Sequence, residues 1–170
     1  MASEALFGFV GVVLGSLTTA VVTIYSERVA GKRELALRTE QHERERQTAR
    51  DTFQRESVLA LQTAVSDMIK ACYDELDRVL AVMADTGTWP AREWATPTAV
   101  GWSDSVLRLE SSLGRVFDEE LRTLAARLRD AAGQSVWART LDEAKSAGAQ
   151  IEPMQVEFNR AVTRVLTTLY

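Results

Sequence analysis

The segment from Ala5 to Tyr25 constrains this chain more than any other feature, because its 21 residues, ALFGFVGVVLGSLTTAVVTIY, include no charged side chain. A helix of that length reaches roughly 31 Å, which matches the hydrocarbon thickness of a bilayer, about 30 Å. Eleven of the 21 residues are Leu, Ile, Phe or Val, whose insertion into a membrane is favourable. We therefore expect residues 1–25 to form an N-terminal transmembrane anchor.

A cleavable signal peptide and a buried soluble helix are the alternatives for this segment. A signal peptide needs a basic n-region and usually a shorter apolar core, but no Lys or Arg precedes Ala5. Basic residues instead follow the span, at Arg28, Lys32, Arg33 and Arg38. Since basic flanks stay on the cytoplasmic side, we expect one pass through the inner or plasma membrane, with the N-terminus outside and the body in the cytoplasm.

One face of the expected span carries small residues: Gly8, Gly11, Gly15 and Thr19. Gly11 and Gly15 have the small-xxx-small spacing that lets two helix backbones approach closely in lipid. Glycine is also common in membrane helices generally. The face therefore indicates transmembrane self-association, and with it a homo-oligomer, without requiring one.

Residues 26–57 have the composition of a solvated helical stalk. They lack proline, and opposite charges recur at helical spacing, in Glu34–Arg38, Glu40–Arg44 and Asp51–Arg55. No large apolar side chain occurs between Arg38 and Thr52, so this stretch has no face to bury in a core.

Residues 58–170 show helical periodicity throughout, which predicts a helical bundle. Apolar residues recur at steps of three and four, first in a stripe of Leu61, Val65, Met68, Cys72, Leu76, Val79 and Met83. A second stripe comprises Val106, Leu109, Leu113, Val116, Phe117, Leu121, Leu124 and Leu128. No segment shows strand alternation flanked by hairpin signals. The fold class is therefore all-α: a transmembrane helix, a long charged stalk helix and a C-terminal bundle of about four helices.

Capping signals set the expected boundaries inside the bundle. Ser103 is a suitable N-cap for a second helix that runs to Ala132, and Gly133 is suitable for its C-terminal end. A short third helix is expected over residues 134–147. Pro153, in a first turn, opens the last helix.

Residues 85–102, DTGTWPAREWATPTAVGW, form the one long connection that the sequence predicts. It contains Trp89, Trp94 and Trp102, three of the four tryptophans in the chain. Tryptophans concentrated in a loop indicate either a lid that packs onto the bundle or a surface that binds a partner. Both interpretations remain open at this point.

The titratable residues do not form a pattern typical of catalysis or of a metal centre. The single histidine, His42, lies in the charged stalk, and the single cysteine, Cys72, lies on an apolar stripe where a thiol acts as a small hydrophobe. The acidic runs Asp118–Glu120 and Asp74, Glu75 and Asp77 are expected to be solvated edges. We expect no enzyme activity, no cofactor and no metal site.

Net charge excludes one further class of partner. Residues 58–170 carry the whole net charge of −4, and nonspecific affinity for nucleic acid depends on Lys and Arg that neutralise phosphates. The expected partners are the lipid bilayer and a protein, with no nucleic acid.

The layout resembles a loose class of uncharacterised bacterial single-pass membrane proteins. The resemblance lies in the glycine-rich segment GFVGVVLGSLTTAVVTIY at 8–25 and the Arg/Glu-rich run KRELALRTEQHERERQTARDTF at 32–53, about the first third of the chain. It implies an anchor, a stalk and a helical region, and it implies no activity.

These features favour a membrane-tethered helical interaction or scaffold module that binds a protein partner. The alternative is a membrane-perturbing or effector protein that oligomerises through its transmembrane helix, on the Gly11 and Gly15 face. The two hypotheses differ in which part of the chain is active: the body or the span.

Overall fold

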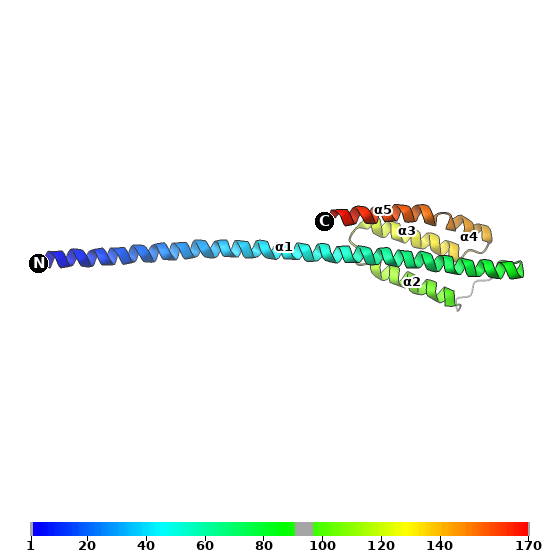
Figure 1. The fold of residues 1–170 in the computed structure, drawn as a ribbon, viewed down its shortest axis with the longest axis horizontal. Helices are drawn as coiled ribbons and strands as arrows, with labels where there is room; N and C mark the ends of the chain where they lie inside the picture. The colour runs from blue at the N-terminus through cyan, green and yellow to red at the C-terminus, as the bar shows by residue number, and fades with distance from the viewer. Residues whose placement is uncertain (1, 91–96, 170) are drawn as a thin grey trace. The chain divides into compact units, whose positions relative to one another are not determined.

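The chain folds into helices alone over the part that the structure describes, which confirms the all-α class. The computed structural model describes the backbone of residues 2–90 and 97–169, and the side chains of residues 38–90 and 99–169. Its elements are α1 (Ala2–Thr86), α2 (Pro97–Leu113), α3 (Glu119–Val136), α4 (Leu141–Gly148) and α5 (Ile151–Thr168), labelled in Figure 1.

The predicted membrane span from Ala5 to Tyr25 belongs to α1, but its side chains lie outside the described residues. Within the described part of the chain, no helix combines the length and the apolar composition that a bilayer crossing requires. The anchor therefore stays a prediction.

The chain divides into two compact units, residues 1–49 and residues 50–170. In the first unit, every side chain described, from residue 38 onward, is exposed. The predicted pair of Glu40 and Arg44 is present, with 2.5 Å between Oε1 and Nη2. This part of α1 is thus solvated, as its lack of large apolar side chains indicates.

Residues 50–170 form the helical body, in which α1, α3 and α5 supply most of the core. The predicted stripe on α1 is buried at Leu61, Val65, Met68, Cys72 and Val79, and half-buried at Leu76 and Met83. It packs with α3 and α5 in one hydrophobic cluster that includes Leu128 and Phe158. The periodicity of α1 therefore predicted its buried face correctly.

The single helix predicted from Ser103 to Ala132 is wrong, because the chain turns between Leu113 and Glu119. The apolar stripe continues in register through this turn, and Val116 is buried although it is not helical. Periodicity alone therefore could not detect the break. The local signals for it are Gly114 and Asp118, whose carboxylate accepts the N–H of Leu121 at 2.8 Å and caps α3.

Three other predicted boundaries are also wrong. Ser103 lies inside α2, where its hydroxyl donates to the carbonyl of Ala99, and the helix begins six residues earlier at Pro97, as proline favours. Gly133 lies inside α3, which continues to Val136. The third helix begins at Leu141 rather than residue 134, because Thr140 caps it by accepting the N–H of Glu143 at 3.2 Å. Pro153, by contrast, lies in the first turn of α5 as predicted.

The connection between α1 and α2 is shorter than the predicted 85–102. Gly87 ends α1 in a left-handed conformation, with φ of 72°, and donates its N–H to the carbonyl of Met83 at 2.8 Å. Trp102 lies in α2. The central residues of the connection, 91–96, are outside the described residues.

Candidate functional site

Two of the three tryptophans that the sequence placed in the predicted loop, Trp89 and Trp102, pack against the body. Trp102 is 5% exposed in the core. The indole N–H of Trp89 donates to the carbonyl of Ala138 at 3.0 Å, which ties the start of the α1–α2 connection to the segment between α3 and α4. Trp94 lies outside the described residues. For Trp89 and Trp102 this placement fits the lid interpretation better than a surface offered to a partner.

The four small residues expected to pair spans, Gly8, Gly11, Gly15 and Thr19, also lie outside the residues whose side chains are described. Their role in self-association stays a prediction.

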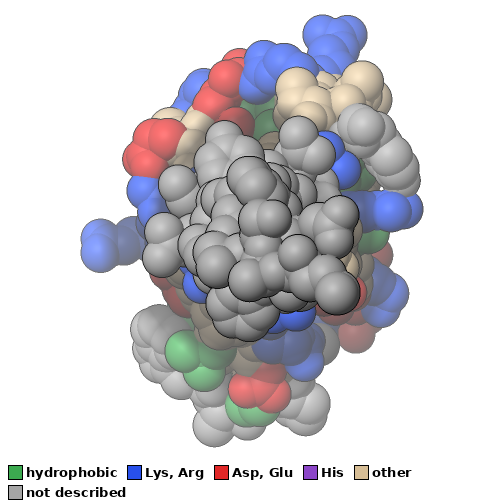
Figure 2. All heavy atoms as spheres, turned by 90° about the vertical axis from the view of Figure 1, so that its left-hand side faces the viewer, with side chains coloured by type: hydrophobic (Ala, Val, Ile, Leu, Met, Phe, Trp, Pro, Cys, Tyr) green, Lys and Arg blue, Asp and Glu red, His purple; other side chains and the backbone are tan. Residues whose placement is uncertain are grey.

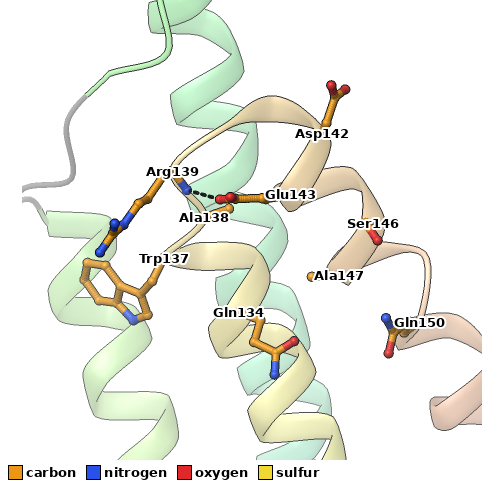
Figure 3. A pocket seen from close by; sticks show the side chains of 9 residues that line it. All are labelled: Gln134, Trp137, Ala138, Arg139, Asp142, Glu143, Ser146, Ala147 and Gln150. Carbon is orange, nitrogen blue, oxygen red and sulfur yellow. Dashed lines mark hydrogen bonds between the residues drawn. The ribbon is translucent and has the colours of Figure 1, made fainter.

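A hollow on the body lies where α3 passes into α4, and it is shown in Figure 3. Its volume is about 670 Å³, and its lining comprises Gln134, Trp137, Ala138, Arg139, Asp142, Glu143, Ser146, Ala147 and Gln150. The Glu143 carboxylate accepts the backbone N–H of Arg139 at 2.8 Å, so its position serves the start of α4. Amides and charges of both signs line the hollow, which gives it no single ligand chemistry.

The acidic run at the start of α3 is used structurally. Asp118 caps the helix, Glu119 pairs with Arg122, and Glu120 pairs with Arg164 of α5 at 2.7 Å. These contacts fix α3 locally and join it to α5. The prediction that these residues lie at a solvated edge is correct for Glu119 and Glu120, which are exposed.

The prediction that Glu75 is solvated is wrong, because its side chain is buried in α1. Its relative exposure is 2%, and both carboxylate oxygens accept from Arg78, at 2.9 Å from Nε and 2.7 Å from Nη2. Its neighbour Asp74 is exposed and pairs with Lys70. A glutamate and an arginine three residues apart were the sequence signal for this pair.

His42 and Cys72 occupy the environments that the sequence predicts. The His42 side chain is 75% exposed, and its Nδ1 lies 3.4 Å from Glu45. The Cys72 thiol is fully buried and lies 3.7 Å from the carbonyl of Ala132. Over the described residues, no three His, Cys, Asp or Glu side chains are grouped so that they could hold a metal ion.

The most distinctive surface feature is a cluster of two phenylalanines and two arginines, here named the Arg–Phe patch: Arg50, Phe53, Arg115 and Phe117. The two rings lie 6.4 Å apart. The guanidinium of Arg50 lies 5.5 Å from the Phe117 ring centre, and that of Arg115 lies 5.5 Å from the Phe53 ring centre. Phe53 is 40% exposed and Phe117 is 58% exposed. Sequence analysis missed this patch, since it placed Phe117 on the buried stripe of a continuous helix.

No family model, curated protein or solved structure matches the chain.

The Gln54 side chain positions the Arg–Phe patch. It is 7% exposed, and its Nε2 donates to the carbonyl of Arg115 at 3.1 Å while its Oε1 accepts the N–H of Phe117 at 2.9 Å. The two bonds lie on either side of Val116, which is buried. The turn between α2 and α3 is thus fixed to α1, and its aromatic side chain is held at the surface.

Proposed function

We propose that this chain is a membrane-tethered helical interaction module. The segment from Ala5 to Tyr25 anchors it, residues 26–49 form a charged stalk, and the compact unit 50–170 binds a protein partner in the cytoplasm. The observation that carries the proposal is the 21-residue segment without charge, followed by a charged helix whose side chains are exposed over residues 38–50, where the structure describes them. Transfer of so much apolar surface out of water favours the bilayer.

The body supports the partner-binding half of this proposal. Its buried core shows that it is a packed unit, and exposed aromatic side chains on a packed unit are typical of protein-binding surfaces. The Arg–Phe patch belongs to this kind of surface, because Arg and aromatic residues are enriched in interface hot spots.

Fractionation of cells tests the tether. After lysis without detergent, we expect the full chain in the membrane pellet, resistant to alkaline carbonate and released by detergent. A variant with Leu14→Arg and Val13→Arg should move to the supernatant, because an arginine at the centre of a span costs roughly 2.5–3.5 kcal/mol. Recovery of the unaltered chain in the supernatant would refute the tether.

The orientation has its own test. A tag at the C-terminus of the full chain should be protected from protease in intact spheroplasts and cleaved after permeabilisation, because the basic residues that follow the span stay inside. Cleavage in intact spheroplasts would place the body on the outside.

The second candidate is oligomerisation through the span, as in a membrane-perturbing protein. It is favoured by the small-residue face of Gly8, Gly11, Gly15 and Thr19. Replacement of Gly11 and Gly15 by Ile should abolish dimers of the full chain in detergent, whereas Val12→Ile should not. Unchanged dimers would remove the basis for this candidate.

A further inference from the structure

The Arg–Phe patch combines an exposed aromatic pair with two cations, and each arginine lies over the phenylalanine of the other element. Arg50 and Phe53 come from α1, whereas Arg115 and Phe117 come from the turn between α2 and α3. Each guanidinium lies over the ring from the other element, with its Cζ 5.5 Å from the ring centre. Such cation–π pairs hold a guanidinium in place at an exposed site, worth about 0.5–1 kcal/mol each.

The backbone beneath the patch is held in one conformation. Gln54 binds the turn on both sides of Val116, and Asp118 caps the helix that follows. Phe117 therefore stays 58% exposed on a fixed turn, although burial would stabilise it. A rigid aromatic group at the surface loses little conformational entropy on binding, which favours an interface role.

The two arginines keep their hydrogen-bond donors for a ligand. Among the described residues, neither Arg50 nor Arg115 forms an ion pair or donates a side-chain hydrogen bond, unlike Arg78, Arg122 and Arg129. A guanidinium carries five N–H donors, and a cation–π contact with a ring uses none of them as a conventional hydrogen bond. Those donors match the bidentate geometry of a carboxylate.

We propose that the Arg–Phe patch binds an acidic segment of a protein partner, in which a Leu or Phe side chain contacts Phe53 and Phe117 while flanking carboxylates bind Arg50 and Arg115. This inference rests on the proposed function and gives that function its docking surface. It does not depend on the tether, because all four residues belong to the compact unit 50–170.

Charge around the patch favours a narrow acidic segment over an anionic membrane. Asp118, Glu119 and Glu120 follow Phe117 directly, and a broad anionic surface would meet these carboxylates as well as the two arginines. An extended peptide can reach the arginines without contacting the acidic run. Nucleic acid is disfavoured on the same ground, since acidic and basic side chains are interspersed on the face in Figure 2.

The test uses the full chain in phosphatidylcholine nanodiscs and a fluorescent 12-residue peptide that repeats Asp-Leu-Glu-Phe. Fluorescence anisotropy should show binding that weakens as salt rises, because ion pairs carry part of the affinity. The matched peptide, with Asn and Gln in place of Asp and Glu, should bind at least about tenfold more weakly.

Variants locate the binding to the patch. Arg50→Gln combined with Arg115→Gln should weaken binding of the acidic peptide by at least about tenfold, and Phe117→Ala should weaken it by a similar factor. The control is Arg127→Gln combined with Arg160→Gln, which removes two exposed charges that are not part of the Arg–Phe patch and should change the affinity by less than about twofold. Circular dichroism establishes that each variant is folded.

Three results would overturn the proposal. The first is no binding of the acidic peptide, or equal loss in the control variant. The second is that the nanodiscs float with vesicles of equimolar phosphatidylcholine and phosphatidylserine but do not bind the peptide. If the arginine replacements also abolish this flotation, the ligand is a membrane. The third is that two nanodiscs associate with each other, that the patch variants abolish this association, and that the peptide does not bind. The ligand would then be a second copy of this chain. Failure of the tether would appear instead as soluble full chain that still binds the peptide.

Discussion

The Gln54 Oε1 accepts the backbone N–H of Phe117 at 2.9 Å, which joins α1 to the α2–α3 turn across 63 positions of sequence. The same amide donates to the carbonyl of Arg115. The buried Gln54 side chain therefore satisfies the Phe117 N–H and the Arg115 carbonyl. These two backbone groups belong to the turn and have no partner within a helix. This contact fixes where the chain reverses between α2 and α3.

Replacement of Gln54 by Leu should destabilise the body by about 1–3 kcal/mol, because two backbone groups lose their partners at a part-buried site. Chemical denaturation followed by circular dichroism measures the change. Gln62→Leu is the control, since Gln62 makes only an exposed contact of 3.4 Å to Asn159 and should cost less than about 0.5 kcal/mol. Equal effects at the two positions would show that the Gln54 contacts contribute nothing.

The ion pair between the buried Glu75 and the half-buried Arg78 predicts a second difference in stability. Glu75→Gln should cost about 1.5–3 kcal/mol, the range for hydrogen bonds that involve a charged group. The adjacent Asp74→Asn should cost less than about 1 kcal/mol, because the bond of Asp74 to Lys70 is solvent-exposed. Thermal unfolding measures the loss of stability in each variant. A Glu75→Gln variant as stable as Asp74→Asn would contradict the prediction.

The sequence predicted the elements whose signal is local. The stripe on α1 and the proline at the start of α5 follow from spacing and from one residue's conformational preference, and both are correct. The turn between Leu113 and Glu119 was missed because Val116 keeps the apolar register while the backbone leaves the helix. Tertiary packing, rather than periodicity, decides such a position.

The candidate surface was missed for the same reason. Phe53 and Phe117 are far apart in sequence, and only the turn brings them to 6.4 Å. The spacing of Glu75 and Arg78 indicates their ion pair, but the burial of Glu75 depends on what packs against α1, which that spacing does not predict. In contrast, the exposure of His42 and the burial of Cys72 follow from their immediate neighbours, and the sequence predicted both.

Tyr73 predicts how stability changes in alkali. Burial raises the pKa of its hydroxyl above the ordinary value of 10.0, and negative charge on Cys72 and Glu152 raises this pKa further. A pKa raised in the folded state favours the neutral form, so the stabilisation is complete below pH 10 and is lost as pH rises through the folded pKa. Tyr73→Phe should therefore flatten the loss of stability in this range.

Ultraviolet titration measures the Tyr73 pKa directly. The full chain has three tyrosines, and one component should ionise above the ordinary pKa and be missing in Tyr73→Phe. Glu152→Gln should move that component toward lower pH, because it removes a negative charge that opposes ionisation. Loss of a component at or below the ordinary pKa in Tyr73→Phe would exclude this account.

Residues 50–170 should fold without the rest of the chain, because the core cluster begins at Val58 and the Gln54 contacts lie within this unit. A fragment that starts at Arg50 is expected to be soluble, helical and cooperative in thermal unfolding.

A fragment that starts at Gln62 is the matched control: it lacks Gln54, Val58 and Leu61, and the last two are fully buried. Loss of a buried Leu costs about 2–5 kcal/mol, and a domain of this size has a stability of only about 5–15 kcal/mol. The shorter fragment should therefore unfold at a much lower temperature or lack a cooperative transition. If both fragments behave alike, the N-terminal part of the body does not contribute to its core; if neither folds, the body depends on residues before Arg50 and is not an independent module.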